Sequence, residues 1–169
     1  MDTKIEPWLR GTHRDLDALV RQVVHSMEQV EEDAERWCAG LSDEEMNARP
    51  HGLPPVAFHL RHMARTLDRL LSYAEGTQLD ATQLAALRTE MDAGATTAAV
   101  MAELNHALEQ TKLRVRTFSP EHYNTDRGVG RKMLPTAIGS LLVHCAEHTQ
   151  RHLGQAITTA KVLLAMRGS

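Results

Sequence analysis

The sequence predicts an all-α protein that folds as a four-helix bundle with short extra helices in the connections. Four long segments carry apolar residues spaced three and four apart, the pattern of amphipathic helices that pack on one another. Pro and Gly residues separate these segments. Apolar residues make up 42% of the chain but aromatic residues only 4%, so we expect a core of Leu, Val, Ala and Met. Neither a repeat nor a linker interrupts residues 1–169, which we assign to a single domain.

The first predicted helix covers residues 12–38. Thr12 is its expected N-cap and Gly40 its expected stop. Its apolar side is formed by Leu16, Leu19, Val20, Val23, Met27 and Val30. A short capped turn follows, in which Ser42 and Glu45 have the spacing of a capping box.

Two more long helices and a short one are predicted in the middle of the chain. The second long helix begins near Pro54 or Pro55, since proline suits a first turn, and runs to about Glu75. A short helix covers residues 81–91, and the third long helix covers residues 97–117.

The last third of the chain is predicted to hold a polar loop and then the fourth long helix. Residues 119–135 are polar, contain Gly128 and Gly130, and are expected to form a loop with one extended stretch, in which residues 127–132 are a flexible, basic segment. The fourth helix begins near Pro135 and continues to about Met166.

Charge and hydropathy argue against nucleic acid or membrane as partners. The formal net charge is -3 at pH 7, with both signs mixed and no long basic run. No stretch of about 18 apolar residues is present, and residues 1–11 lack the apolar core of a signal peptide. Cys38 and Cys145 form no disulfide framework or metal-ligand spacing, so we expect free thiols, with Cys145 packed as a small apolar residue. We therefore expect a cytoplasmic protein.

Three histidines stand four residues apart in the fourth predicted helix: His144, His148 and His152, in LLVHCAEHTQRHLGQAI. A step of four returns a side chain to within about 40° of its starting direction, so the imidazoles form a row on one face. Two such rings one turn apart can chelate one divalent ion. Apolar neighbours such as Leu141 and Ala156 indicate that the row faces the bundle interior, where unpaired imidazoles are unfavourable.

The second predicted helix offers further ligands of the same type. His59 and His62 lie three residues apart in VAFHLRHMA, inside an apolar stripe. Helix bundles build metal sites from side chains on facing helices, so either histidine can complete the set. The histidines that we expect to fall outside any cluster, and not to bind metal, are His13, His25, His106 and His122.

These segments together resemble the DinB/YfiT-like superfamily of bacterial proteins, classed as predicted metalloenzymes. LSDEEMNARPHGLPPVAFHLRHMA is similar to the family's approach to its second helix, and HTQRHLGQ is similar to its HxxxH followed by Gly-Gln. The resemblance covers roughly residues 10–166. It implies a four-helix bundle and a homodimer, with His62, His148 and His152 binding a divalent transition metal, usually zinc or nickel, between the second and fourth helices.

The chemistry of three imidazoles agrees with that implication. Neutral nitrogen ligands suit Zn, Ni, Co or Fe better than Mg or Ca, and three protein ligands leave a position open for water or substrate. His144 and His59 are the candidate catalytic residues, with a role as further ligands left open. Glu147 is expected to face solvent or a neighbouring helix. Gln155 either points toward the metal or packs between helices, and Gly154 is expected to admit a close neighbouring helix.

The sequence is compatible with three functions. The resemblance implies an S-transferase that uses a low-molecular-weight thiol such as bacillithiol or mycothiol as its small-molecule partner. The alternatives are a metal-dependent hydrolase and a non-catalytic stress-related protein that binds metal or a small ligand. A transferase needs cations for the carboxylates of the thiol, and the candidates are Arg61, Arg65, Arg127 and Arg131. A hydrolase needs a general base, for which His144, His59 or Glu147 are available. A binding protein would use His144 as a fourth ligand.

Overall fold

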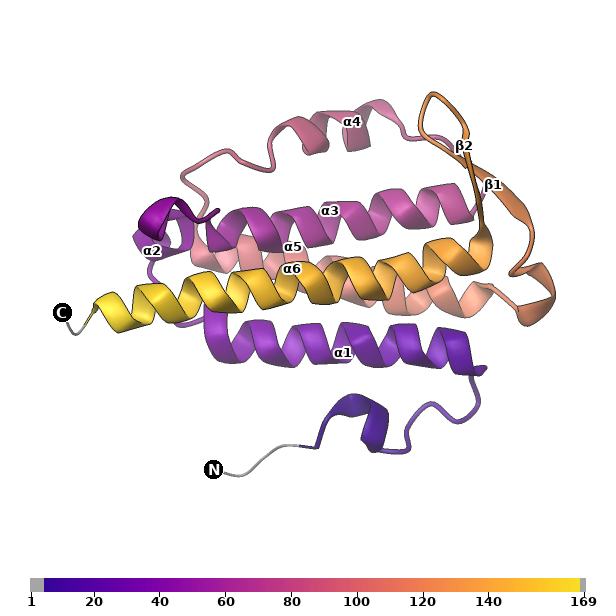
Figure 1. The fold of residues 1–169 in the computed structure, drawn as a ribbon, viewed down its shortest axis with the longest axis horizontal. Coiled ribbons are helices and arrows are strands. Elements are labelled where there is room, and N and C mark those ends of the chain that lie inside the picture. The colour runs from indigo at the N-terminus through magenta and orange to yellow at the C-terminus, as the bar shows by residue number, and fades with distance from the viewer. Residues whose placement is uncertain (1–4, 168–169) are drawn as a thin grey trace.

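The computed structural model describes residues 5–167 and has the predicted all-α bundle architecture (Figure 1). Its elements are α1 (Ala18–Cys38), α2 (Asp43–Asn47), α3 (Val56–Ala74), α4 (Ala81–Arg88), α5 (Thr97–Arg114), β1 (Asp126–Val129), β2 (Leu134–Ala137) and α6 (Ile138–Met166). The domain ends predicted at residues 1 and 169 lie outside the described residues. Among the described residues, no helix is long and apolar enough to cross a membrane.

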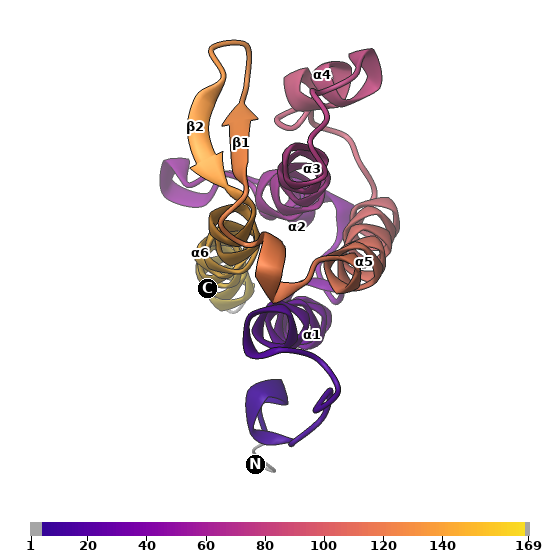
Figure 2. The ribbon, with the colours of Figure 1, turned by 90° about the vertical axis from the view of Figure 1, so that its right-hand side faces the viewer.

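The four long helices surround one core. Viewed along the bundle, α1, α5, α3 and α6 follow one another around the core, so that α6 lies between α3 and α1 (Figure 2). The segment that carries α4 runs back along the outside of α3, and α5 therefore starts at the same end of the bundle as α3 (Figure 1). Largest among the fully buried core side chains are Met27, Met46, Leu60, Met63, Leu67, Leu71, Leu104, Leu108 and Leu142. The predicted core of Leu, Val, Ala and Met is confirmed.

The start of the first helix differs from the prediction. α1 begins at Ala18, and Asp17 rather than Thr12 is its N-cap, because the Asp17 carboxylate accepts hydrogen bonds from the backbone N–H of Leu19 and Val20. Residues 5–16 form an arm that folds back along α1 (Figure 1). Arg10 fixes this arm by two hydrogen bonds to the Glu32 carboxylate, of 2.6 and 2.8 Å.

The connections keep their predicted caps but not all of their predicted lengths. Ser42 and Glu45 form the predicted capping box of α2. α3 starts directly after Pro55. α4 is capped by Asp80 and Gln83 and ends at Arg88, three residues before the predicted end. α5 gives way at its end to a 3-10 turn over Val115–Thr117.

The predicted flexible loop contains a β-hairpin, which delays the start of the last helix. β1 and β2 pair antiparallel, with Gly128 opposite Pro135 and Val129 opposite Leu134. Pro135 is therefore a strand residue, and α6 begins three residues after it. Arg127 donates from Nε to the carbonyl of Ala74 at 2.8 Å, which fastens the hairpin to the end of α3.

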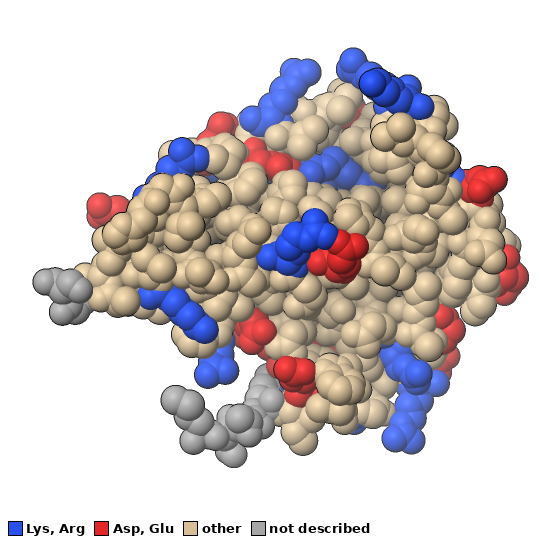
Figure 3. Space-filling view, viewed as in Figure 1, with Lys and Arg blue, Asp and Glu red and all other residues tan. Residues whose placement is uncertain are grey.

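The surface seen in Figure 3 carries Lys and Arg interspersed with Asp and Glu. No continuous basic area covers this face. This distribution agrees with the net charge of -3 and gives no support for a nucleic-acid interface on that side of the molecule.

Replacing Leu142 by Ala is expected to lower the free energy of unfolding by about 2–5 kcal/mol, because the side chain is completely buried in the core. The neighbouring Val143 is 51% exposed, so Val143→Ala should change it by no more than about 0.5 kcal/mol. Urea denaturation of both variants measures the difference, and equal losses would contradict the assigned packing face of α6.

Candidate metal centre

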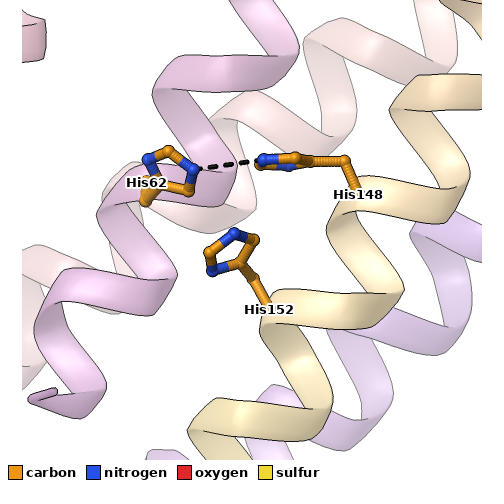
Figure 4. A group of neighbouring side chains, drawn as sticks. All are labelled: His62, His148 and His152. Carbon is orange, nitrogen blue, oxygen red and sulfur yellow. Dashed lines mark hydrogen bonds between the residues drawn. The ribbon is translucent and has the colours of Figure 1, made fainter.

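α3 and α6 bring His62, His148 and His152 together (Figure 4). His62 Nε2 lies 3.1 Å from His148 Nε2, and the ring of His152 lies 4.4 Å from that of His62 and 4.6 Å from that of His148. Figure 4 shows a ring nitrogen of His152 pointing toward the other two rings. One donor atom from each residue lies within 4.8 Å of the other two.

The protonation state and the spacing of these rings suit a transition metal. Burial, followed by the neighbouring histidines, lowers the pKa of His148 and that of His152 to about 4, so both imidazoles are neutral near pH 7 and keep a lone pair. Ligand bonds of about 2.1 Å in a tetrahedral site place two nitrogens about 3.4 Å apart, and the pair His62–His148 is already at 3.1 Å. An all-nitrogen donor set favours Zn²⁺, Ni²⁺ and similar ions.

A buried carboxylate orients His62. Glu90 is 5% exposed, and its Oε2 lies 2.7 Å from His62 Nδ1. Its other oxygen accepts a hydrogen bond of 2.7 Å from Arg69. Burial raises the pKa of Glu90, but the hydrogen bonds from His62 and Arg69 outweigh burial and leave the pKa below its usual value. The ionised carboxylate accepts a hydrogen bond from His62 Nδ1–H, so the proton stays on Nδ1 and the Nε2 lone pair faces His148.

Glu90 is a functional residue that the sequence did not point to. It follows α4, in a segment predicted to be the end of a short helix, and lies 28 residues after His62. No periodic pattern connects positions so far apart. The available signal was Arg69, which lies seven residues after His62 on α3 and is 9% exposed. A buried guanidinium requires an anionic partner.

His59 lies beneath the cluster, buried in the core, and contacts His152. It is 2% exposed, and its Nδ1 lies 3.1 Å from His152 Nδ1. Burial, together with His152 and His62, lowers the pKa of His59 to about 4. The rings of His59 and His152 are therefore both neutral. One Nδ1 donates a hydrogen bond to the other, and this contact leaves Nε2 of His152 facing the cluster. Phe58 stacks on His62, with the ring centres 5.4 Å apart.

His144 lies at the rim instead of inside. Its side chain is 41% exposed, with Nδ1 3.3 Å from Glu147. The expectation that the whole histidine row faces the interior is wrong for this residue. Each step of four rotates the direction by about 40°, so the row turns away from the core over two steps. Glu147 faces solvent and pairs with Arg151.

Several other residues weighed in the sequence lie outside the cluster. A Cβ on Gly154 would meet no atom within 4 Å, so the expected close helix contact is absent there. Gln155 is exposed. Burial raises the pKa of Cys145 to about 12, so this thiol is no nucleophile. Three of the candidate arginines are held by the protein: Arg61 by Asp92, Arg65 by Glu103, and Arg127 by Ala74.

The structure also brings together histidines that the sequence treats as isolated. His13, His25 and Glu28 each offer a donor atom within 4.8 Å of the other two. The prediction that His13 and His25 fall outside any cluster is therefore wrong. In the described part of the chain, His106 and His122 belong to neither group.

Metal-free protein is expected to lose stability as the pH falls from 6.5 to about 4. His59, His148 and His152 have their pKa lowered to about 4 in the folded chain, whereas an unfolded histidine titrates near 6.5. The unfolded state therefore binds more protons in this window, and protonation favours it. Urea denaturation in the presence of a chelator, repeated across this pH window, measures how the free energy of unfolding depends on pH. His122→Gln should leave this pH dependence unchanged, and His148→Gln should reduce it. An unchanged pH dependence in His148→Gln would contradict the assignment of His148 as a neutral histidine of the cluster.

Glu90→Gln is expected to weaken zinc binding by about 10–100-fold, because a neutral amide no longer orients His62 or balances Arg69. Competition with a chromophoric chelator measures the affinity. The matched control is Glu147→Gln, because the Glu147 side chain is 50% exposed and its partners are His144 at the rim and Arg151, which are not among the three proposed ligands. Equal affinities of the two variants would show that Glu90 does not act on the site.

Comparison with known proteins places the chain in a family. No curated protein matched the sequence. A family model described as the DinB superfamily matches residues 26–156. The matched region includes His62, Glu90, His148 and His152, and extends from α1 into α6. The match agrees with the resemblance seen in the sequence, and the chain belongs to the DinB superfamily.

Proposed function

We propose that this chain is a metal-dependent S-transferase in which His62, His148 and His152 bind one divalent transition ion, zinc or nickel. The observation that carries the proposal is the convergence of three imidazole nitrogens from α3 and α6, and among the described residues no other His, Cys, Asp or Glu belongs to this group. Three protein ligands are the usual number at a catalytic zinc site, where a further position accepts a substrate. The small-molecule substrate that fits best is a low-molecular-weight thiol.

The residues around the cluster have defined tasks in this proposal. A transition ion bound there would supply Lewis acidity that stabilises the thiolate form of a coordinating thiol. Glu90 and Arg69 hold the orientation of His62, and His59 holds that of His152. Phe58 stacks on the ring of His62 and lies edge-on to the ring of His152, which limits the movement of both rings. The thiol must come from the substrate, since both cysteines are buried and burial raises the pKa of each thiol to about 12.

A hollow beside the histidines supports a small-molecule substrate. Its volume is about 430 Å³, and its wall includes Phe58 and Glu90, which both contact His62, together with Arg49 and Met91; none of the three histidines is part of this wall. Arg49 is exposed and is a better candidate for a substrate carboxylate than the arginines considered from the sequence, since those candidates lie elsewhere or already bind backbone or carboxylate groups.

The alternatives have less support. A hydrolase needs a general base, but a pKa of about 4 makes His59 a weak one near pH 7. A closed binding site needs His144 as a fourth ligand, and that side chain is 41% exposed beside Glu147. We further propose a cytoplasmic homodimer that binds neither nucleic acid nor membrane; the mixed surface charge in Figure 3 supports the absence of a nucleic-acid partner.

His148→Ala and His152→Ala are each expected to abolish tight metal binding, because each removes one of three ligands. His106→Ala is the matched control, since His106 lies outside both histidine groups of the described chain. Elemental analysis of protein purified without a His-tag, after dialysis against a weak chelator, gives the metal content. A His148→Ala protein with the metal content of the wild type would show that the assigned site is wrong.

Cobalt substitution tests the open coordination position. The visible spectrum of the cobalt protein is expected to change when a low-molecular-weight thiol is added, because thiolate sulfur enters the coordination sphere. A spectrum that responds neither to thiols nor to other exogenous ligands would contradict the transferase proposal and favour a closed, non-catalytic site.

A further inference from the structure

The arm that precedes α1 folds back so that His13 lies over two residues of that helix. His25 and Glu28 are three positions apart on α1 and therefore neighbours on its surface. His13 Nε2 lies 2.7 Å from the Glu28 carboxylate, and the rings of His13 and His25 are 5.5 Å apart. The arm lies on the outer side of α1, away from α3, so this group is separate from the centre between α3 and α6 (Figure 1).

The group is partly shielded from water. His25 is 5% exposed, and the side chains of His13 and Glu28 are 25% and 24% exposed. Burial is the main cause that lowers the pKa of His25, so its imidazole is neutral near pH 7 and keeps a lone pair. Two imidazoles and a carboxylate are a donor set that zinc and other first-row transition metals use.

The backbone at His13 has a strained conformation, and this conformation directs the His13 ring toward α1. His13 has φ 55°, a left-handed conformation that is unfavourable for a residue other than glycine. The two hydrogen bonds between Arg10 and Glu32 hold the arm in place three residues earlier. The arm therefore presents His13 to α1 at an energetic cost, which a ligand bound by the group would offset.

Two further contacts to these histidines would change when a metal binds. Arg116 donates to His13 Nδ1 over 3.3 Å, and the Thr12 hydroxyl lies 3.1 Å from His25 Nε2. With Nδ1 as acceptor, the proton of His13 is on Nε2, where it donates to Glu28. A metal at Nε2 would need the proton on Nδ1 instead, so the exposed contact to Arg116 must break. Arg116 thus opposes metal binding.

We propose that His13, His25 and Glu28 form a second binding site for a divalent transition ion, which fastens the arm to α1. The competing explanation is that hydrogen bonds alone hold the arm against α1. It predicts one bound metal ion per chain instead of two. In the absence of metal the same three residues hold the arm through the contact between His13 and Glu28.

Zinc titration of the double variant His148→Ala/His152→Ala isolates the second site. We expect one zinc ion per chain in this variant and two in the wild type. Adding Glu28→Gln should remove the remaining ion, and the matched control His122→Gln should leave it. Arg116→Gln should bind zinc more tightly, because the opposing donor is lost. Binding of no zinc by the double variant, with its circular dichroism unchanged, would overturn the proposal.

A second measurement keeps the test decisive if the double variant does not fold. In the wild type, Glu28→Gln is expected to reduce the zinc stoichiometry from two to one while the tight site remains. Hydrogen exchange of residues 8–16 should slow on addition of zinc in the wild type but not in Glu28→Gln. An unchanged zinc stoichiometry in Glu28→Gln would contradict the second metal site and show that hydrogen bonds alone hold the arm.

Discussion

The buried contact of Glu90 with His62 and Arg69 is the constraint on which the rest of the site depends. Both partners are on α3, whereas Glu90 lies in the turn after α4. A buried carboxylate is stable only when it is paired, so its position and that of Arg69 are mutually dependent. The same contact determines which nitrogen of His62 carries the proton. The same contact therefore orients the candidate ligand His62 and attaches the α4 segment to α3.

The path of the chain makes this interaction possible. The connection between α3 and α5 runs back along α3 instead of turning directly into the next helix (Figure 1). Its return brings Glu90 over the part of α3 that carries His62. Arg65 and Arg61 bind backbone carbonyls of the same connection, at Ala86 and Asp92, and add to its attachment. A direct turn between α3 and α5 would leave the histidines without their carboxylate.

The two histidine groups follow one physical principle at different depths. In both, burial lowers the pKa of an imidazole (His148 in one group, His25 in the other), and a carboxylate accepts a hydrogen bond from a ring N–H. In the centre between α3 and α6 the carboxylate is itself neutralised by Arg69, so that three nitrogens remain as donors. On the outer side of α1, Glu28 interacts with the charge of Arg10, whose side chain is 26% exposed, and Glu28 is a donor of the proposed group. Depth and charge balance thus decide whether the carboxylate orients a ligand or serves as one.

By itself the sequence determined the helices and the direction of side chains within each helix. Apolar periodicity defines α1, α3, α5 and α6, and the fixed rotation per residue places His148 and His152 on one face. The pairing of His62 with them came from the family resemblance, which includes both segments. Only the tertiary structure decided the roles of Glu90, His144 and His13. Glu90 acts across 28 residues from a turn, His144 is exposed at the rim of α6, and His13 reaches α1 through a folded arm. Periodicity describes local direction, whereas contacts between distant segments depend on how the helices pack.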